Sequence, residues 1–291
     1  MRHILVTGAN KGIGLAIAEA ILKEHADTFV FLGARDRERG RAAAAGLVSE
    51  QPAWKERIQV VALDVTNAGS VSEATGVVAD GLRGDALYGL VNNAGIGGDR
   101  GLDAMFETNT LGVERVFRAF APLLASTARI VNVTSAAGPS FVATCSLDRQ
   151  RFFLDAQTTW PALRAFMDEC LQITGGPPAF AAKGLGDGSP YGLSKACANT
   201  YTLILAREHP SLGVNACTPG FIITDMTRHY VESQAKSPAD LGMKTPADGA
   251  KAPLHLLFGA LEGNGRYYGS DGKRSPLDRY RGPGAPQYTG A

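Results

Sequence analysis

The stretch from His3 to Gly14, HILVTGANKGIG, decides the fold. Its first four residues predict a short buried strand, and a helical pattern runs from Gly12 to about Glu24. The glycines between them (Gly8, Gly12 and Gly14) let the backbone adopt positive φ or approach a ligand closely. Helix N-terminal amides attract anions, so this strand, turn and helix predict a phosphate-binding loop. Taken alone, the glycine triplet fits a plain turn equally well.

The first two-thirds of the chain repeats this alternation of short apolar runs with longer helical ones. Further strands are expected at Thr28–Gly33, Ile58–Leu63, Leu87–Val91, Arg129–Thr134 and Gly213–Thr218. Strands that alternate with helices imply right-handed crossovers and a mostly parallel sheet. We therefore expect an α/β fold, a Rossmann-type doubly wound parallel sheet flanked by helices on both faces.

The alternation breaks after Ser140, where residues 141–188 predict a helical insertion with no strand. Two helices are expected there, at Ser146–Gln157 and Pro161–Ile173, followed by a loop up to residue 188. Alternation then resumes with helices at Ser189–Glu208 and near Ala247–Leu261. The tail, residues 271–291, is rich in Gly, Pro and Arg and is expected to lie loosely on the surface or to be disordered.

The composition narrows the class of protein. The chain has 291 residues, 45% of them hydrophobic and 20% charged, with a formal net charge of +1. Because no long basic run is present, a nucleic-acid partner is disfavoured. The N-terminal apolar run is too short for a signal or a membrane span, and the four cysteines show no C-x-x-C spacing. We expect a cytoplasmic protein with reduced thiols. The five histidines are scattered, so no metal site is predicted.

The residues at the end of the second predicted strand indicate whether the chain binds NAD or NADP. An acidic residue there would bind the ribose hydroxyls of NAD, whereas this chain has Ala34 followed by Arg35. A guanidinium suits a 2′-phosphate, so Arg35, helped by Lys11 in the glycine loop, favours NADP(H). Arg39 adds a third positive charge or is a solvated surface cation. Asp64, after the third strand, is a candidate partner for the adenine amino group.

Seven motifs in order resemble the short-chain dehydrogenase/reductase superfamily. They are TGANKGIG (7–14), LDV (63–65), NNAG (92–95), ETNTLG with Asn109, VTS (133–135), YGLSK (191–195), and TPG with TDM (218–226). The resemblance covers residues 1–270 and implies a single NADP(H)-binding reductase domain. It implies these cofactor contacts: Gly8, Asn10, Lys11, Gly12, Ile13, Gly14, Arg35, Arg39, Asp64, Val65, Asn93, Ala94, Gly95, Tyr191, Lys195, Pro219, Gly220, Ile222 and Thr224.

The spacing between two of these motifs indicates a subgroup of the superfamily. Compact members place the catalytic serine about a dozen residues before the tyrosine, but here the separation from Ser135 to Tyr191 is 191 − 135 = 56 residues. A long helical insertion at this point is similar to that of the monomeric carbonyl reductases and of salutaridine reductase-like plant enzymes. In the usual tetramers, the tyrosine helix packs against its symmetry mate. An insertion over that face would block the contact, so the resemblance implies a monomer.

The resemblance also implies a proton-relay tetrad of Asn109, Ser135, Tyr191 and Lys195. Tyr191 would donate its phenolic proton to the carbonyl oxygen as hydride reaches the carbon. Lys195, one turn away on the same helix face, is expected to lower the pKa of the phenol from its usual value of about 10 and to hold the nicotinamide ribose. Ser135 would hydrogen-bond the carbonyl, and Asn109 would anchor a water that links the lysine to solvent.

The implied activity is NADPH-dependent reduction of aldehydes, ketones or quinones to alcohols. Ser135, Phe141, Phe221 and Met226 are candidates for contact with this small-molecule carbonyl substrate, although the apolar ones fit a core equally well. Two alternatives stay open. One is a dedicated ketoreductase or dehydrogenase for one secondary metabolite or steroid, and the other is a non-catalytic NADP(H)-sensing protein.

Overall fold

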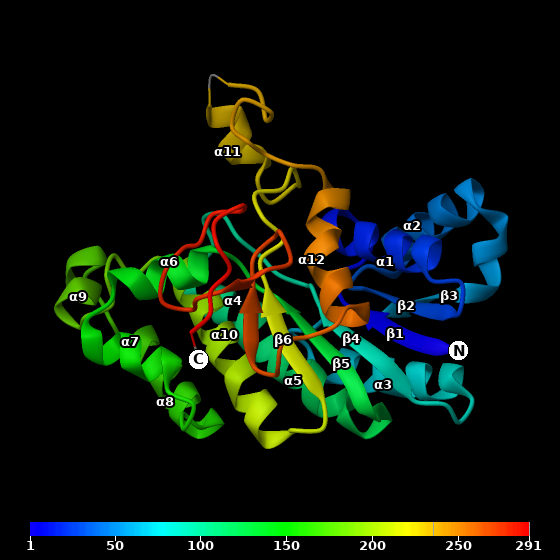
Figure 1. Ribbon diagram of the computed structural model, residues 1–291, viewed down its shortest axis with the longest axis horizontal. Helices are drawn as coiled ribbons and strands as arrows, with labels where there is room; N and C mark the ends of the chain where they lie inside the picture. Colours follow the sequence, from blue (N-terminus) through cyan, green and yellow to red (C-terminus); the bar gives the residue numbers. More distant parts are fainter. Residues whose placement is uncertain (235, 291) are drawn as a thin grey trace.

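The computed structural model describes residues 1–234 and 236–290. Within them, eight strands form one sheet in the order β3-β2-β1-β4-β5-β6-β7-β8 (Figure 1). The strands are β1 (Arg2–Val6), β2 (Thr28–Ala34), β3 (Ile58–Ala62), β4 (Leu87–Asn92), β5 (Leu124–Val133), β6 (Gly213–Cys217), β7 (Arg266–Tyr268) and β8 (Arg274–Ser275). Strands β1 to β7 pair in parallel, and β8 is antiparallel to β7.

Helices cover both faces of the sheet. They are α1 (Gly12–Glu24), α2 (Arg37–Glu50), α3 (Ala68–Leu82), α4 (Leu102–Phe106), α5 (Gly112–Phe120), α6 (Ala137–Thr144), α7 (Leu147–Leu154), α8 (Trp160–Leu171), α9 (Pro177–Ala182), α10 (Pro190–Glu208), α11 (Arg228–Ser233) and α12 (Pro246–Phe258). One apolar core lies under α1 and α12, and a second lies under α3, α5 and α10. The predicted doubly wound fold is confirmed.

The inserted segment is helical, as the sequence predicts, and it packs on α10. The rings of Phe152, Phe153 and Phe166 meet at centroid distances of 4.8 to 5.7 Å. Trp160 at the start of α8 lies 5.0 Å from the ring of Tyr201 on α10. Figure 1 shows α6 to α9 grouped beside α10. The insertion therefore buries apolar surface of the helix that carries YGLSK.

Two segments differ from the sequence-based expectation. The predicted loop before residue 188 contains α9, which begins with two prolines at positions that tolerate a missing N–H. The tail is tied down, because β8 pairs with β7 and the side chain of Arg281 is only 6% exposed in its ion pair with Asp271. Glycine and proline content indicated looseness, whereas strand pairing and this ion pair fix the segment.

The cysteines, the helices and the possible metal ligands also bear on the class of protein. All four cysteines are buried and free. Among the helices of residues 1–234 and 236–290, none combines the length and apolar character needed to cross a bilayer. The same residues contain no cluster of three His, Cys, Asp or Glu side chains suited to a metal ion.

Candidate active site

The glycine loop lies at the topological switch point of the sheet. β1 pairs with both β2 and β4, so the loops that follow β1 and β4 leave the same sheet edge side by side. Ligands of doubly wound sheets bind in this crevice, outside the carboxyl ends of the strands. The candidate residues after β3, β5 and β6 emerge at the same edge because these strands run in parallel.

The loop itself needs its glycines. Gly8 and Gly12 have φ values of +62° and +57°, which side-chain-bearing residues rarely adopt. A Cβ on Gly14 would lie 2.4 Å from both Asn93 Nδ2 and the Gly8 carbonyl oxygen. Lys11 caps α1 with no side-chain hydrogen bond to its first amides. The first amides of α1 therefore have no side-chain cap, and this cradle of backbone N–H groups fits the pyrophosphate of a dinucleotide.

Asn93 holds the loop from behind. Its Nδ2 donates to the carbonyl oxygens of Thr7 (3.0 Å) and Gly8 (3.2 Å). In return, the Thr7 hydroxyl accepts from the backbone amides of Asn93 and Ala94, both at 3.0 Å. A Cβ on Gly8 would stand 2.9 Å from Ala94 Cα, so the two loops touch. Asn93 and Thr7 thus position the cradle, and sequence reasoning missed the part played by Thr7.

The predicted cations have different surroundings. Arg35 is exposed at the end of β2 and makes no ion pair with any described residue. Arg39 lies 3.5 Å from Asp36, which caps α2. Lys11 Nζ lies 2.7 Å from Asp225 in the segment after β6, so this cation faces that segment in the structure. Arg35 is therefore the cation most available to a ligand phosphate.

Other predicted cofactor residues line the same edge. Asn10 and Ile13 belong to the loop, Asp64 and Val65 follow β3, and Pro219, Gly220, Ile222 and Thr224 follow β6. Asp64 Oδ1 accepts from the amide and hydroxyl of Thr66. A Cβ on Gly12 would contact Thr224 Cγ2 at 3.5 Å, so the segment after β6 lies against the glycine loop.

Asn109 is buried in a π-helical turn, Glu107–Leu111, between α4 and α5. Its Oδ1 accepts from the amide of Ile96 (2.9 Å), and its Nδ2 donates to the Ile96 carbonyl and to Ser194 Oγ, both at 3.0 Å. π-Helical turns are rare and frequently mark functional sites. A Cβ on Gly95 would stand 3.1 Å from Asn109 Oδ1 and 3.3 Å from Lys195 Nζ. These two side chains therefore approach the same point over Gly95.

α10 presents Tyr191 and Lys195 on one face. The Ser189 hydroxyl accepts from the Gly192 amide, and Pro190 occupies the first turn, so the cap fixes where the helix begins. Lys195 Nζ lies 5.8 Å from the centre of the Tyr191 ring and donates to the Val133 carbonyl at 3.3 Å. The lysine is only 4% exposed. The structure therefore brings the predicted phenol and ammonium together.

Burial dominates the titration of both groups. It lowers the pKa of Lys195 from 10.5 to about 8. Burial also raises the pKa of Tyr191, and a hydrogen bond with Ser135 opposes that rise. The pKa of the phenol is therefore raised in this structure, where a lowering was expected, because removing the phenolate from water outweighs its favourable contacts. The hydrogen bond shows that Ser135, two residues after β5, lies beside Tyr191.

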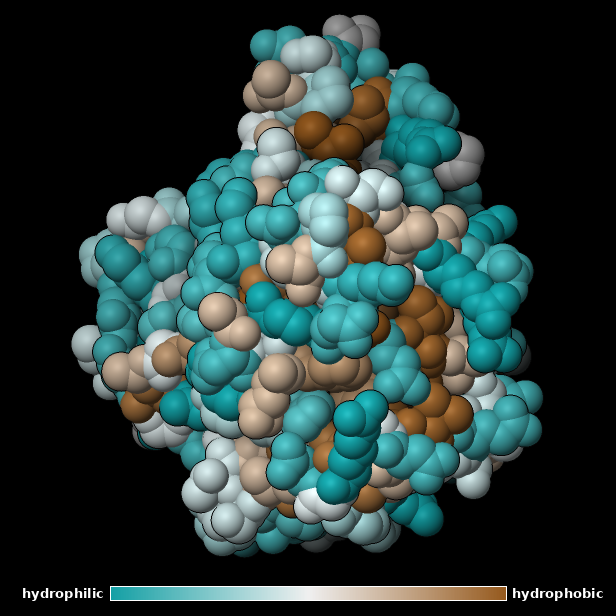
Figure 2. Space-filling view, turned by 90° about the vertical axis from the view of Figure 1, so that its right-hand side faces the viewer, coloured by the Kyte–Doolittle hydropathy of each residue, from teal (hydrophilic) through white to brown (hydrophobic). Residues whose placement is uncertain are grey.

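The segment after β6 carries exposed apolar side chains toward this site. Phe221 and Met226 are both more than two-fifths exposed, and Phe221 stacks edge-on with Tyr230 at 5.6 Å. A Cβ on Gly97 would lie 3.0 Å from Met226 Sδ and 3.8 Å from Tyr191 Cδ2. Met226 thus lies near the phenol. Figure 2 shows apolar surface on the lobe formed by this segment.

Phe141 has a different environment. It is buried and contacts Phe153 of the insertion at a ring distance of 6.2 Å. A Cβ on Gly192 would stand 2.9 Å from its Cβ, so Phe141 packs against the side of α10. Its side chain belongs to the core beneath the insertion, and we leave it out of the substrate wall.

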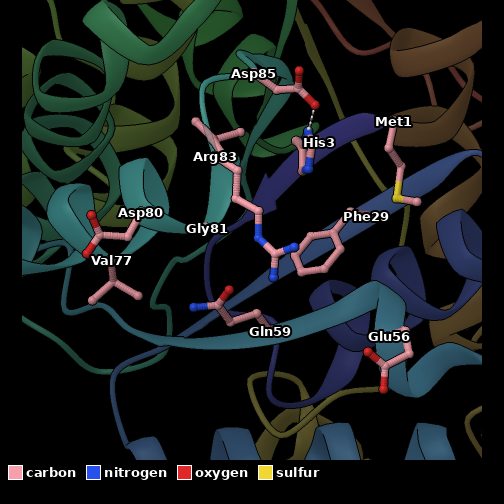
Figure 3. A pocket seen from close by; sticks show the side chains of 11 residues that line it. Met1, His3, Phe29, Glu56, Gln59, Val77, Asp80, Gly81, Arg83 and Asp85 are labelled. Carbon is pink, nitrogen blue, oxygen red and sulfur yellow. Dashed lines mark ion pairs between the residues drawn. The ribbon is translucent and has the colours of Figure 1, made fainter.

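A separate cavity lies at the opposite edge of the sheet. It measures about 600 Å³ and is lined by residues that include His3, Phe29, Gln59, Arg83 and Asp85. Figure 3 shows these side chains around the amino ends of β1 and β2. Ligands of doubly wound folds bind at the opposite, carboxyl edge, so this cavity is separate from the candidate active site.

Comparison with known proteins agrees with this geometry. Residues 2–146 match the family described as short chain dehydrogenase. The chain is 33% identical over 275 residues to carbonyl reductase [NADPH] 3 of Rattus norvegicus, covering 88% of this chain and 91% of that protein.

Solved structures are also similar. Salutaridine reductase from Papaver somniferum superimposes with a TM-score of 0.75 at 24% identity, covering 92% of this chain and 99% of that one. An NADPH-bound carbonyl reductase from chicken fatty liver gives a TM-score of 0.66 at 25% identity, covering 94% and 98%. With the ordered motifs and a matching fold, this chain belongs to the short-chain dehydrogenase family of oxidoreductases.

Proposed function

We propose that this enzyme reduces the carbonyl group of aldehydes, ketones or quinones to an alcohol with NADPH. One observation carries the proposal: Asn109, Lys195, Tyr191 and Ser135 come together at the sheet edge that holds the glycine loop. A proton donor thus stands beside a dinucleotide cradle. The carbonyl reductases among the relatives support the same reaction class.

Bound on the glycine loop between Gly8 and Gly14, NADPH would supply a hydride to the carbonyl carbon. Tyr191 donates its phenolic proton to the carbonyl oxygen, where negative charge develops. Its raised pKa keeps the phenol protonated and ready to donate in the resting enzyme. The Ser135 hydroxyl orients the carbonyl beside the phenol. Burial lowers the pKa of Lys195 to about 8, so the lysine is still mostly protonated at neutral pH and would stabilise the phenolate as it forms.

Asn109 keeps the relay in place. Its amide is fixed by Ile96 and Ser194, and its oxygen points to the place that Lys195 Nζ approaches. A water held there would connect the ammonium with solvent and restore the proton after each turnover. Asn109 and Ser194 are therefore proposed to position the lysine.

The preference for NADPH over NADH rests on Arg35. Ala34 ends β2 without a carboxylate, and the next residue is an exposed guanidinium. This arrangement attracts a 2′-phosphate, and the end of β2 lacks the acidic residue that would bind the two ribose hydroxyls of NADH. Arg39 lies one turn along α2, where its neighbour Asp36 partly neutralises it.

The insertion supports a monomer. It covers the side of α10 with aromatic rings, including the Trp160–Tyr201 contact. The four free cysteines fit a reducing compartment, and we propose the cytoplasm.

The direct test follows NADPH absorbance with a panel that includes menadione and isatin. Consumption of NADPH that depends on both enzyme and carbonyl compound is expected, with NADH giving a much lower rate. Tight NADPH binding without turnover of any panel member would instead favour a cofactor-sensing protein.

A further inference from the structure

The π-helical turn Glu107–Leu111 packs against α10 beside the candidate general acid. The amide of Gly112 donates to the carbonyl oxygen of Glu107, five residues earlier, so the turn is wider than an α-helical one. Asn109 and Thr110 are both buried in this turn. Asn109 belongs to the proposed proton relay, whereas Thr110 has no part in it so far.

Thr110 and Asn109 bind the same residue of α10. The Thr110 hydroxyl donates to the carbonyl oxygen of Ser194 at 2.9 Å, and Asn109 Nδ2 donates to Ser194 Oγ at 3.0 Å. Adjacent residues of a regular α-helix do not share a face, so they seldom reach one residue of a neighbouring helix. In the π turn both side chains do so, and Ser194 is completely buried between them and α10. The turn therefore fixes its own position against α10 at Ser194.

Ser194 connects this contact to the two titratable groups of the site. Its hydroxyl donates to the Tyr191 carbonyl oxygen at 2.9 Å while it accepts from Asn109. The Ser194 carbonyl belongs to the peptide unit that joins Ser194 to Lys195. Because that unit is planar, the hydrogen bond from Thr110 also restrains the backbone nitrogen of Lys195.

The side chain of Lys195 needs such a restrained backbone. Its Nζ donates to the Val133 carbonyl oxygen at 3.3 Å, longer than the usual N–H···O distance of about 2.9–3.0 Å. A lysine stem has several rotatable bonds, so its ammonium stays in place only if the backbone beneath it is fixed. Rotation of α10 about its axis would change the distance of 5.8 Å between Nζ and the centre of the Tyr191 ring.

Resting on the proposed function, we propose that Thr110 is a positioning residue for carbonyl reduction. It holds the peptide between Ser194 and Lys195, and so keeps the ammonium aligned with the phenol of Tyr191. Thr110 acts through Ser194 and not on the reacting atoms. Loss of its hydroxyl therefore slows proton transfer, which is sensitive to small misplacements, and leaves the binding of substrate unchanged.

Thr200 offers a matched control on the same helix. Its hydroxyl is also buried, and it donates to the carbonyl oxygens of Phe153 in the insertion, at 3.0 Å, and of Ala196, at 3.2 Å. Thr200→Val and Thr110→Val each replace a buried, hydrogen-bonded hydroxyl by a methyl group. The two variants should therefore lose similar stability in thermal melting, whereas only one of them changes the contact with the π turn.

The kinetic test compares wild type, Thr110→Val, Thr110→Ser and Thr200→Val with menadione and isatin. Thr110→Val is expected to lower kcat about three- to tenfold, the effect of one neutral hydrogen bond, with KM for the carbonyl compound and Kd for NADPH within about twofold. Thr110→Ser keeps the hydroxyl and should restore kcat to within about twofold of wild type. Thr200→Val should stay within the same limit.

Amide hydrogen exchange of the cofactor-free protein gives a readout that does not depend on turnover. Thr110→Val should speed exchange in residues 107–112 and 191–198, where the π turn meets α10, and Thr200→Val should leave residues 107–112 unchanged. If Thr110→Val does not fold, Thr110→Ala removes the same hydroxyl with a smaller side chain and takes its place in both experiments.

The opposite results overturn the positioning role. They are a wild-type kcat in Thr110→Val, a loss that Thr110→Ser does not restore, an equal loss in Thr200→Val, or unchanged exchange in residues 107–112 and 191–198. Wild-type turnover in the same assays keeps the proposed carbonyl reduction intact in each of these cases. A wild-type enzyme that reduces no compound of a wider panel overturns the proposed function, and the role of Thr110 in it falls as well.

Discussion

The Nζ atom of Lys195 lies 5.8 Å from the centre of the Tyr191 ring, one helical turn further along α10. This spacing lets a buried cation act on a phenol without forming a direct ion pair with it. Burial raises the pKa of Tyr191 and lowers that of Lys195 to about 8, so at neutral pH the phenol is protonated and the lysine is still mostly charged. The site is therefore poised to give a proton when charge develops on a bound carbonyl oxygen.

Gly14→Ala should abolish cofactor binding. The new Cβ would lie 2.4 Å from Asn93 Nδ2 and from the Gly8 carbonyl, so the loop must shift away from its cradle geometry. We expect at least a hundredfold weaker NADPH binding by fluorescence titration. Gly46→Ala is the control, because a Cβ there meets nothing within 4 Å on α2. It should leave binding intact and stabilise the helix by about 0.5–1 kcal/mol. Equal NADPH affinity in the two variants would show that the glycine loop does not bind the cofactor.

Arg35→Ser should discriminate between the dinucleotides. Losing a charge-assisted hydrogen bond to the 2′-phosphate is expected to weaken NADPH binding about tenfold to a hundredfold, while NADH binding changes little. Arg41→Ser is the control, since Arg41 on α2 pairs with Glu38 at 2.7 Å. The measurement is the ratio of the two dissociation constants. A ratio that does not change in Arg35→Ser would remove this arginine from the site.

Lys195→Met should stabilise the protein while it impairs turnover. Burial lowers the pKa of Lys195 to about 8, so below that pH the fold pays to keep a buried charge. Between about pH 8 and 10.5 the folded protein has released the proton while the unfolded chain retains it, so wild-type stability from this group rises with pH. Methionine removes the cost, and we expect a gain of roughly 2–3 kcal/mol at pH 7.

Denaturant unfolding of the cofactor-free protein at pH 7 and pH 10 measures this difference. The gain should shrink at the higher pH, because the wild-type lysine is by then mostly neutral in the fold. A gain of the same size at both pH values would mean that lysine titration does not contribute to it.

The insertion should keep the protein monomeric. Light scattering during gel filtration is expected to give the mass of a single chain across a wide concentration range. A stable dimer or tetramer in the wild type would show that the covered face of α10 does not control assembly.

Phe153→Ala, which removes a ring from the cluster on α10, should lower the free energy of unfolding by about 3–5 kcal/mol.

Much of the fold could be predicted from local sequence. The HILV strand, the glycine turn and the helix that follows agree with β1 and α1, because apolar periodicity and glycine act over a few residues. The positions of Tyr191 and Lys195 on one face of α10 also follow from helix geometry alone.

Contacts between distant segments could not be predicted in this way. β8 pairs with β7 and holds a Gly- and Pro-rich tail on the sheet, and composition carries no signal for that pairing. Lys11 pairs with Asp225, far along the chain, rather than standing free toward a phosphate. Phe141 follows the serine motif but is buried against Phe153, because its direction depends on how α6 packs.

Tyr191→Phe tests the central claim most directly. The substitution removes one hydroxyl and keeps the ring that lies beside Lys195. NADPH oxidation with a substrate of the wild type is expected to fall by about 10²–10⁴ in kcat, the usual contribution of a positioned general acid, while the dissociation constant for NADPH stays within about twofold. Activity in Tyr191→Phe equal to that of the wild type would contradict the account.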